Sequence, residues 1–193
     1  RFFSWRRNEA SACDLSLVTG YHRLLLRIMP KSKFSLASID PGLRDLVSRT
    51  DQRILAFWAI DCAGRVLPFF EKRFPGDRRP RTALEVLQRW IETGVFKMSE
   101  IRGASLAAHA AARDMGEDDP ARSAARAAGQ AVAAAHVPAH SLAAASYALQ
   151  AIHRASDPSR ADAAVSKERQ RQLQRLIRLR EKGARNGERS PSN

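Results

Sequence analysis

The sequence contains no long run of apolar residues. The longest candidate, residues 24–29, is interrupted by Arg27, whereas a membrane-spanning helix needs about 18 consecutive apolar residues. No secretory signal is readable either, because acidic residues rather than an apolar segment follow the basic pair Arg6 and Arg7. These absences predict a soluble, cytoplasmic protein with no membrane partner. The chain begins with Arg1 rather than Met, which indicates a fragment, a processed product or an uncertain gene start.

Cysteine and catalytic motifs are also scarce. The only cysteines, Cys13 and Cys62, are too few for a disulfide scaffold or a cysteine-based zinc site. Cys62 lies among apolar residues and is interpreted as a small core residue. The sequence contains no G-x-S-x-G, G-x-x-x-x-G-K-[ST] or G-x-G-x-x-G motif. We therefore expect a protein that is not an enzyme and needs no cofactor.

Acidic residues are fewer than basic residues, and the net charge is +13. The excess lies in the flanks, because residues 1–49 and 156–193 each carry +5 and residues 50–155 carry only +3. Basic flanks can contact nucleic-acid phosphates weakly and without reading sequence, but they are more often solvated tails. A nucleic-acid-associated accessory protein is therefore an alternative hypothesis and not the leading one.

Signals for β-strands are missing, whereas helix signals are frequent. No β-branched alternation and no Asn-Gly turn occurs. Asp40, Asp51 and Pro120 are typical helix starts, and Thr93-Gly94 is a typical helix end. The prediction is an all-α fold, a single bundle of five to six helices over residues 40–182. A basic, poorly structured N-terminal extension (1–39), with at most a short helix, and a disordered tail (183–193) flank it.

Alanine dominates the middle of the predicted bundle. Residues 104–151 contain 21 alanines in 48 positions, and alanine both favours helices and lets their axes approach closely. Gly103 and Gly129 stand alone in this region, and we attribute both to close helix packing. The last predicted helix, residues 163–182, has a thin apolar face formed by Leu173, Leu176 and Ile177.

Two histidines, His136 and His140, are spaced as metal ligands would be on one helix face. Pro138 lies between them and disfavours a straight helix. We therefore expect both rings at a corner between two helices, bonded to carbonyl groups at a helix end. A cryptic metal-dependent enzyme that also uses His109 is the second alternative.

One acidic residue, Asp61, lies close to the apolar stripe of its predicted helix. A half-buried carboxylate of this kind can act as a general base, but it is more often paired with an arginine. No second acid at a catalytic spacing is identifiable. The polar candidates for structural or partner-binding roles are Asp51, Arg53, Asp61, Arg79, Arg81, His109, Arg113, His136 and His140.

Several segments together carry a resemblance to a known family. They are Thr50-Asp51-Gln52-Arg53 followed by LAFWAIDCAGRVLPFFE to Glu71, Asp77-Arg78-Arg79-Pro80-Arg81 with Ala83, Glu85 and Trp90, SLAAHAAAR to Arg113, AARAAGQAVAAAHVPAH to His140 with Ala144, Tyr147 and Ala148, and Glu168-Arg169-Gln170-Arg171-Gln172.

With these segments, residues 50–180 resemble the alpha-helical immunity proteins of bacterial polymorphic-toxin systems, the immunity-five-like family. Two positions depart from the family pattern, because Gln130 stands in place of a histidine and Arg171 in place of a tryptophan. The resemblance implies a protein that binds a cognate toxin and neutralises it by occlusion. It implies no catalytic residue.

Overall fold

All elements in the described part of the chain are helical. The computed structural model describes residues 34, 35 and 40–188. Its elements are α2 (Pro41–Ser48), α3 (Gln52–Glu71), α4 (Arg79–Thr93), α5 (Met98–Arg113), α6 (Pro120–Ala133), α7 (His140–Ala155), a short 3-10 helix (Pro158–Arg160) and α8 (Ala161–Glu188). The predicted all-α class is confirmed, with seven α-helices among the described residues instead of five or six.

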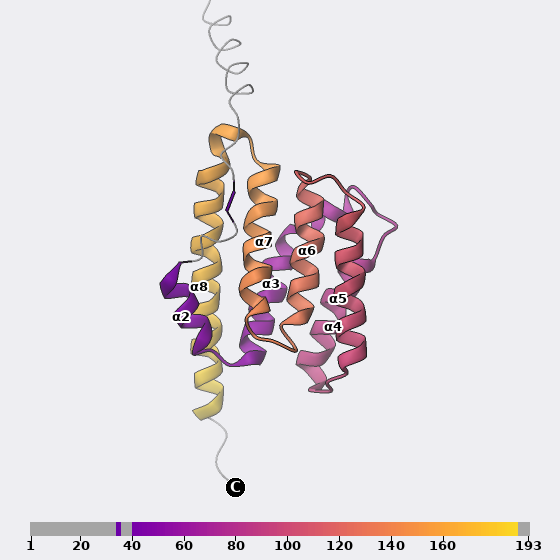
Figure 1. The fold of residues 1–193 in the computed structure, drawn as a ribbon. Coiled ribbons are helices and arrows are strands. Elements are labelled where there is room, and N and C mark those ends of the chain that lie inside the picture. The colour runs from indigo at the N-terminus through magenta and orange to yellow at the C-terminus, as the bar shows by residue number, and fades with distance from the viewer. Residues whose placement is uncertain (1–33, 36–39, 189–193) are drawn as a thin grey trace, which may run out of the picture.

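The helices form two layers around α6. Figure 1 shows α8, α7, α6 and α5 side by side in one layer, with α3 and α4 behind them. The alanine-rich α6 packs against α3, α4, α5 and α7. Nine of its residues are buried, among them Ala124, Ala128 and Val132. The small side chains allow the four neighbouring helices to approach α6 closely, as the alanine content predicted.

Side-chain caps fix where the first helices begin. Asp40 Oδ1 accepts a hydrogen bond from Leu43 N at 2.9 Å, and Asp51 Oδ1 accepts one from Arg53 N at 2.9 Å. These two caps begin separate helices, α2 and α3, which accounts for the additional helix. Gly94 ends α4 with a φ of 70°, a left-handed conformation that favours glycine.

The two helical glycines of the alanine-rich region differ in their surroundings. A Cβ atom at Gly129 would lie 3.0 Å from His109 Nε2, so a larger residue there would crowd the His109 ring between α5 and α6. A Cβ atom at Gly103 would meet nothing within 4 Å. Close packing therefore explains Gly129, but the same interpretation of Gly103 was wrong.

Helix α8 is longer than predicted and packs differently. It ends at Glu188, so residues 183–188 are helical where the sequence predicted a disordered tail. Of its predicted apolar face only Leu176 is buried, whereas Leu173 and Ile177 are 37% and 40% exposed. Polar Glu168 and Gln172 are buried in their place.

Most of the N-terminal extension lies outside the described residues. This includes the segment for which the sequence suggested a short helix. Of the residues before Asp40, Phe34 is placed against the bundle, because its ring centroid lies 5.5 Å from that of His153 in α7. None of the described helices is both long enough and apolar enough to cross a membrane.

Candidate functional site

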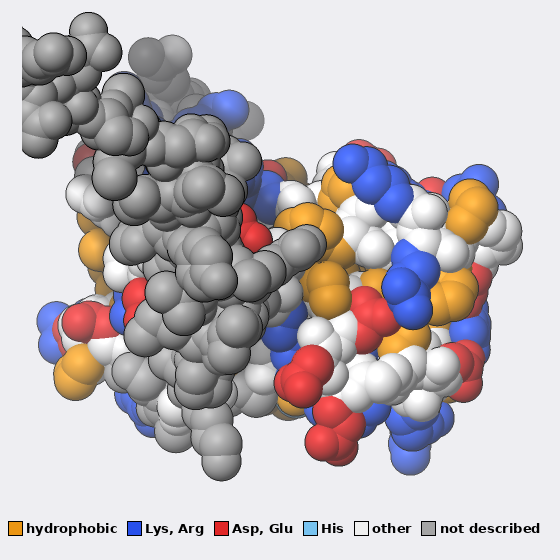
Figure 2. Space-filling model, turned by 90° about the horizontal axis from the view of Figure 1, so that it is seen from above, with side chains coloured by type: hydrophobic (Ala, Val, Ile, Leu, Met, Phe, Trp, Pro, Cys, Tyr) orange, Lys and Arg blue, Asp and Glu red, His pale blue; other side chains and the backbone are white. Residues whose placement is uncertain are grey.

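The two ends of the bundle have different chemical characters. At the end where α3 finishes and α4 and α6 begin, oppositely charged side chains pair across helices. Arg79 Nη2 lies 2.6 Å from Asp77 Oδ2 and 2.8 Å from Asp114 Oδ2. Figure 2 views this end from above and shows acidic and basic groups close to one another. The hydrogen bonds from Arg79 lower the pKa of the Asp77 carboxyl below its ordinary value.

The opposite end of the bundle carries a cluster of exposed apolar side chains. They come from the α4–α5 loop and the α6–α7 turn, which lie at the lower end in Figure 1, and from α5, which rises from that end. Each is between 38% and 59% exposed, and together they account for five of the eight exposed large hydrophobic residues in the described part of the chain. We name this surface the apolar corner, formed by Val95, Phe96, Met98, Leu106 and Val137.

A cavity of about 350 Å³ opens at the apolar corner. One wall comes from α5, and the other comes from Ala133 and His136 at the end of α6. The α5 residues recur at three- and four-residue spacing, so they form one continuous helix face. That wall consists of Met98, Ile101, Arg102, Ser105 and Leu106.

Hydrogen bonds from side chains hold the backbone around this cavity. Gln52 at the start of α3 donates through Nε2 to the carbonyl oxygens of Ala134 and Ala135, at 3.0 Å and 2.9 Å. Ser105 Oγ donates to Gly129 O at 2.9 Å and joins α5 to α6. Because these contacts cross between helices, the two walls have fixed positions before any partner arrives.

The charges at the apolar corner are positive and unpaired. Lys97 and Arg102 are exposed, and neither of their side chains has a hydrogen bond or ion pair among the described residues. The nearby carboxylate of Glu100 pairs with Arg89 instead. None of the residues that line the cavity is acidic.

His109 and His140 lie on either side of the Gln130 amide. His140 Nδ1 and Gln130 Oε1 are 2.7 Å apart, and Gln130 Nε2 and His109 Nε2 are 3.4 Å apart. Burial lowers the pKa of His109, and the charges of Arg126, Arg113 and His140 lower it further. The pKa of His140 is lowered by burial and then by His136. The lowered pKa values favour the neutral form of both imidazoles.

The three histidines do not converge on one point. His136 lies in the α6–α7 turn, as expected, but its ring is turned toward Phe96, with the centroids 6.4 Å apart. His140 begins α7 and bonds the Gln130 side chain rather than the helix-end carbonyl that we expected. Across residues 34, 35 and 40–188, no group of three or more His, Cys, Asp or Glu side chains could hold a metal ion.

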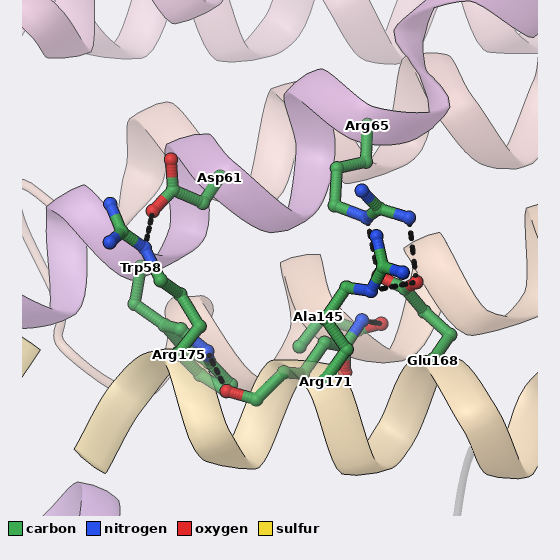
Figure 3. A network of polar contacts seen from close by, with 8 residues as sticks. Trp58, Asp61, Arg65, Ala145, Glu168, Arg171 and Arg175 are labelled. Atoms are coloured by element: carbon green, nitrogen blue, oxygen red, sulfur yellow. Dashed lines mark hydrogen bonds and ion pairs between the residues drawn. The ribbon is translucent and has the colours of Figure 1, made fainter. Parts of the chain in front are cut away.

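A second polar network joins α8 to α3 (Figure 3). Asp61 pairs with Arg175, as the sequence suggested for this carboxylate. Arg65 donates to both carboxylate oxygens of the buried Glu168, at 2.8 Å and 3.0 Å. Trp58 Nε1 donates to the carbonyl oxygen of Gln172 at 2.8 Å. The network docks α8 on α3.

Burial below this network disfavours the reactive thiolate form of Cys62. Its pKa is raised above the ordinary thiol value by burial and then by the charges of Glu168 and Asp61. The side chain is buried between α3 and its neighbours. A thiol held in its protonated form is a poor nucleophile. This position agrees with the interpretation of Cys62 as a core residue.

The other polar candidates contact neighbouring helices or lie at the surface. Asp51 caps α3, and Arg53 donates to the carbonyl oxygen of Ile91 at the end of α4. Arg81 pairs with Glu71 at 2.7 Å. Arg113 is exposed and lies on α5 beyond the cavity.

The apolar corner was not predicted from the sequence. Its members are scattered among loop and helix positions and share no motif. One signal was present, because Val95, Phe96 and Met98 follow the helix-ending Gly94, where a loop would ordinarily be polar.

Comparison with known proteins gives one match. Residues 45–179 match the model of a family described as Imm-5 like putative immunity protein. The match begins within α2 and ends within α8, so it covers well over half of the chain. It confirms the resemblance seen in the sequence motifs. No curated protein and no solved structure matches the chain.

Proposed function

This chain belongs to the Imm-5 like putative immunity protein family, and on that premise we propose that it binds a cognate bacterial toxin and blocks the toxin by occlusion. The family match over residues 45–179 carries this proposal. Inhibition by occlusion requires only a complementary surface with a few buried anchor residues. The proposed action is therefore stoichiometric binding without a chemical step.

The apolar corner supports this function. Protein interfaces bury an apolar centre inside a polar rim, and most of the binding energy comes from a few central side chains. The corner provides exposed Phe96, Met98 and Leu106 around a cavity, with Lys97 and Arg102 beside them. At the charged end of the bundle, by contrast, several carboxylates and guanidinium groups already pair with one another.

Co-expression tests the proposal directly. The toxin domain encoded beside the gene is expressed in a bacterial host with and without the full chain, and growth and complex formation are measured. We expect the chain to restore growth and to co-purify with the toxin in a one-to-one complex. Unchanged toxicity and no complex between the purified proteins would contradict the proposed function.

A further inference from the structure

We propose that the apolar corner is the face that receives the partner, and that it receives an acidic segment with an aliphatic or aromatic anchor side chain. The inference rests on the proposed function for the identity of the partner as a toxin. The chemistry of the bound segment follows from the cavity, from the exposed face of α5 and from the unpaired cations around them.

The cavity has a suitable size for an anchor side chain. A cavity of about 150 Å³ is enough to hold benzene in a protein interior, and this one has a volume of about 350 Å³. Met98, Ile101 and Leu106 supply apolar contacts along its α5 wall. Burial of one phenylalanine or leucine from a partner would remove apolar surface from water on both sides.

None of the described helices covers the α5 face at the corner. Other faces of α5 pack against α4 and α6. The stripe from Met98 to Leu106 lies beside the α6 end but remains open outward, and Leu106 is 55% exposed. An exposed apolar patch next to a preformed cavity is typical of a protein–protein contact site.

The charges around the cavity favour an acidic segment. Lys97 and Arg102 are exposed on either side of Met98 and Ile101, and no acidic residue lines the cavity. Glutamate or aspartate beside the anchor would meet complementary charge.

A second copy of this chain is a poor candidate for the occupant. In a symmetric dimer through the corner, the same surface would face itself. Lys97 and Arg102 of one copy would then approach the corresponding cations of the other. Like charges across an interface disfavour association, so the corner favours an acidic partner over itself.

Binding measurements on the full chain test this inference. The toxin is titrated by calorimetry into wild type and into two corner variants, Leu106→Ser and Arg102→Glu. Both side chains are exposed, so the variants should fold. We expect each to weaken binding by about tenfold or more, because one removes an anchor contact and the other reverses a complementary charge.

Matched variants elsewhere on the surface provide the controls. Leu173→Ser truncates an exposed leucine on α8, and Arg44→Glu reverses an exposed arginine on α2. Neither should change the affinity for the toxin by more than about twofold. If the wild type binds the toxin and the corner variants bind equally well, the assignment of the corner is wrong while the proposed function stands.

A peptide titration separates the two proposals when the toxin does not bind. The probe is a short peptide with a central phenylalanine flanked by glutamates, observed by amide chemical shifts of the full chain. We expect shifts around Met98, Leu106 and His136. They should weaken when alanine replaces the phenylalanine or lysine replaces the glutamates. Equal binding of all three peptides, shifts at another surface, or no binding would overturn the inference.

Discussion

The absence of a side chain at Gly129 leaves room for the His109 ring. Gly129 faces the imidazole directly, and the same ring approaches the Gln130 amide that also bonds His140. The Gln130 amide thereby joins the His109 and His140 rings. The arrangement of His109, Gln130 and His140 thus depends on the small size of Gly129 as well as on the hydrogen bonds between the polar side chains.

Replacing Gly103 and replacing Gly129 by alanine should therefore have opposite effects on the stability of the fold. Gly103→Ala fills open space within α5, and we expect it to stabilise the fold by about 0.5–1 kcal/mol because alanine favours helix. Gly129→Ala displaces the His109 ring, and the resulting overpacking should cost about 1–3 kcal/mol. This cost should exceed the gain in helix propensity from alanine, so the variant should be less stable than the wild type. Urea unfolding of the two variants measures both changes. Equal stabilisation by both would contradict the packing seen at Gly129.

Acid should destabilise the fold through His109 and His140. Burial lowers the pKa of both groups in the folded state, so below about pH 6.5 the unfolded chain binds more protons than the folded one. The free energy of unfolding should therefore fall as the pH is lowered from about 7.5 to about 5.5. The variant His109→Asn/His140→Asn should lose part of this dependence. A slope of the opposite sign in the wild type would refute the pKa directions.

At the scale of elements, the docking of α8 depends on one buried carboxylate. Glu168 is 4% exposed and receives two hydrogen bonds from Arg65, whereas Asp61 and Arg175 are both more than one-third exposed. A carboxylate removed from water needs its partner much more than an exposed one does. The two ion pairs in Figure 3 should therefore differ in their contribution to stability.

Two arginine variants separate these contributions. Arg65→Ala should cost about 3 kcal/mol, the low end for breaking a buried pair, because Arg171 remains 3.9 Å from Glu168. Arg175→Ala removes an exposed pair and should cost about 1 kcal/mol or less. Chemical denaturation at neutral pH gives both values. Arg65→Lys serves as a control that retains the charge, and similar losses for both alanine variants would contradict the argument.

The elements themselves were largely predictable, because their signals are local. Asp40, Asp51, Pro120 and Gly94 act within one turn of their own position, and the structure uses each as predicted. The end of α8 was not predictable from composition. Gly183 lies so close to α3 that a Cβ atom there would be 2.8 Å from Ile54 Cδ1, a tertiary contact that local signals do not encode.

At the scale of the whole molecule, the sequence identified candidate polar residues more readily than it identified the contacts that they make. Asp61 was expected to pair with an arginine, whereas Arg81 was a polar candidate without an assigned partner. Their partners, Arg175 and Glu71, are set by helix packing. The apolar corner was missed because it joins residues from a loop, a helix and a turn. Such a surface exists only after α5 and the α6–α7 turn are brought together.

The bundle should fold without its N-terminal extension. We expect a fragment of residues 40–188 to unfold cooperatively and to give a strongly helical circular dichroism spectrum, because the described helices share one core. A fragment ending at 182 should fold as well, with somewhat lower stability, because it lacks Gly183 beside Ile54. A non-cooperative transition in both fragments would show that the fold needs more of the chain.

The bond between Trp58 and Gln172 also has a consequence for biosynthesis. These residues are 114 positions apart, and at roughly 5–20 residues per second a ribosome adds the second about 6–23 s after the first. During that interval the indole N–H of Trp58 and the Arg65 guanidinium lack the partners that α8 supplies. The bundle is therefore completed only after α8 has been synthesised, and until then a host chaperone would meet α3 with one side still open.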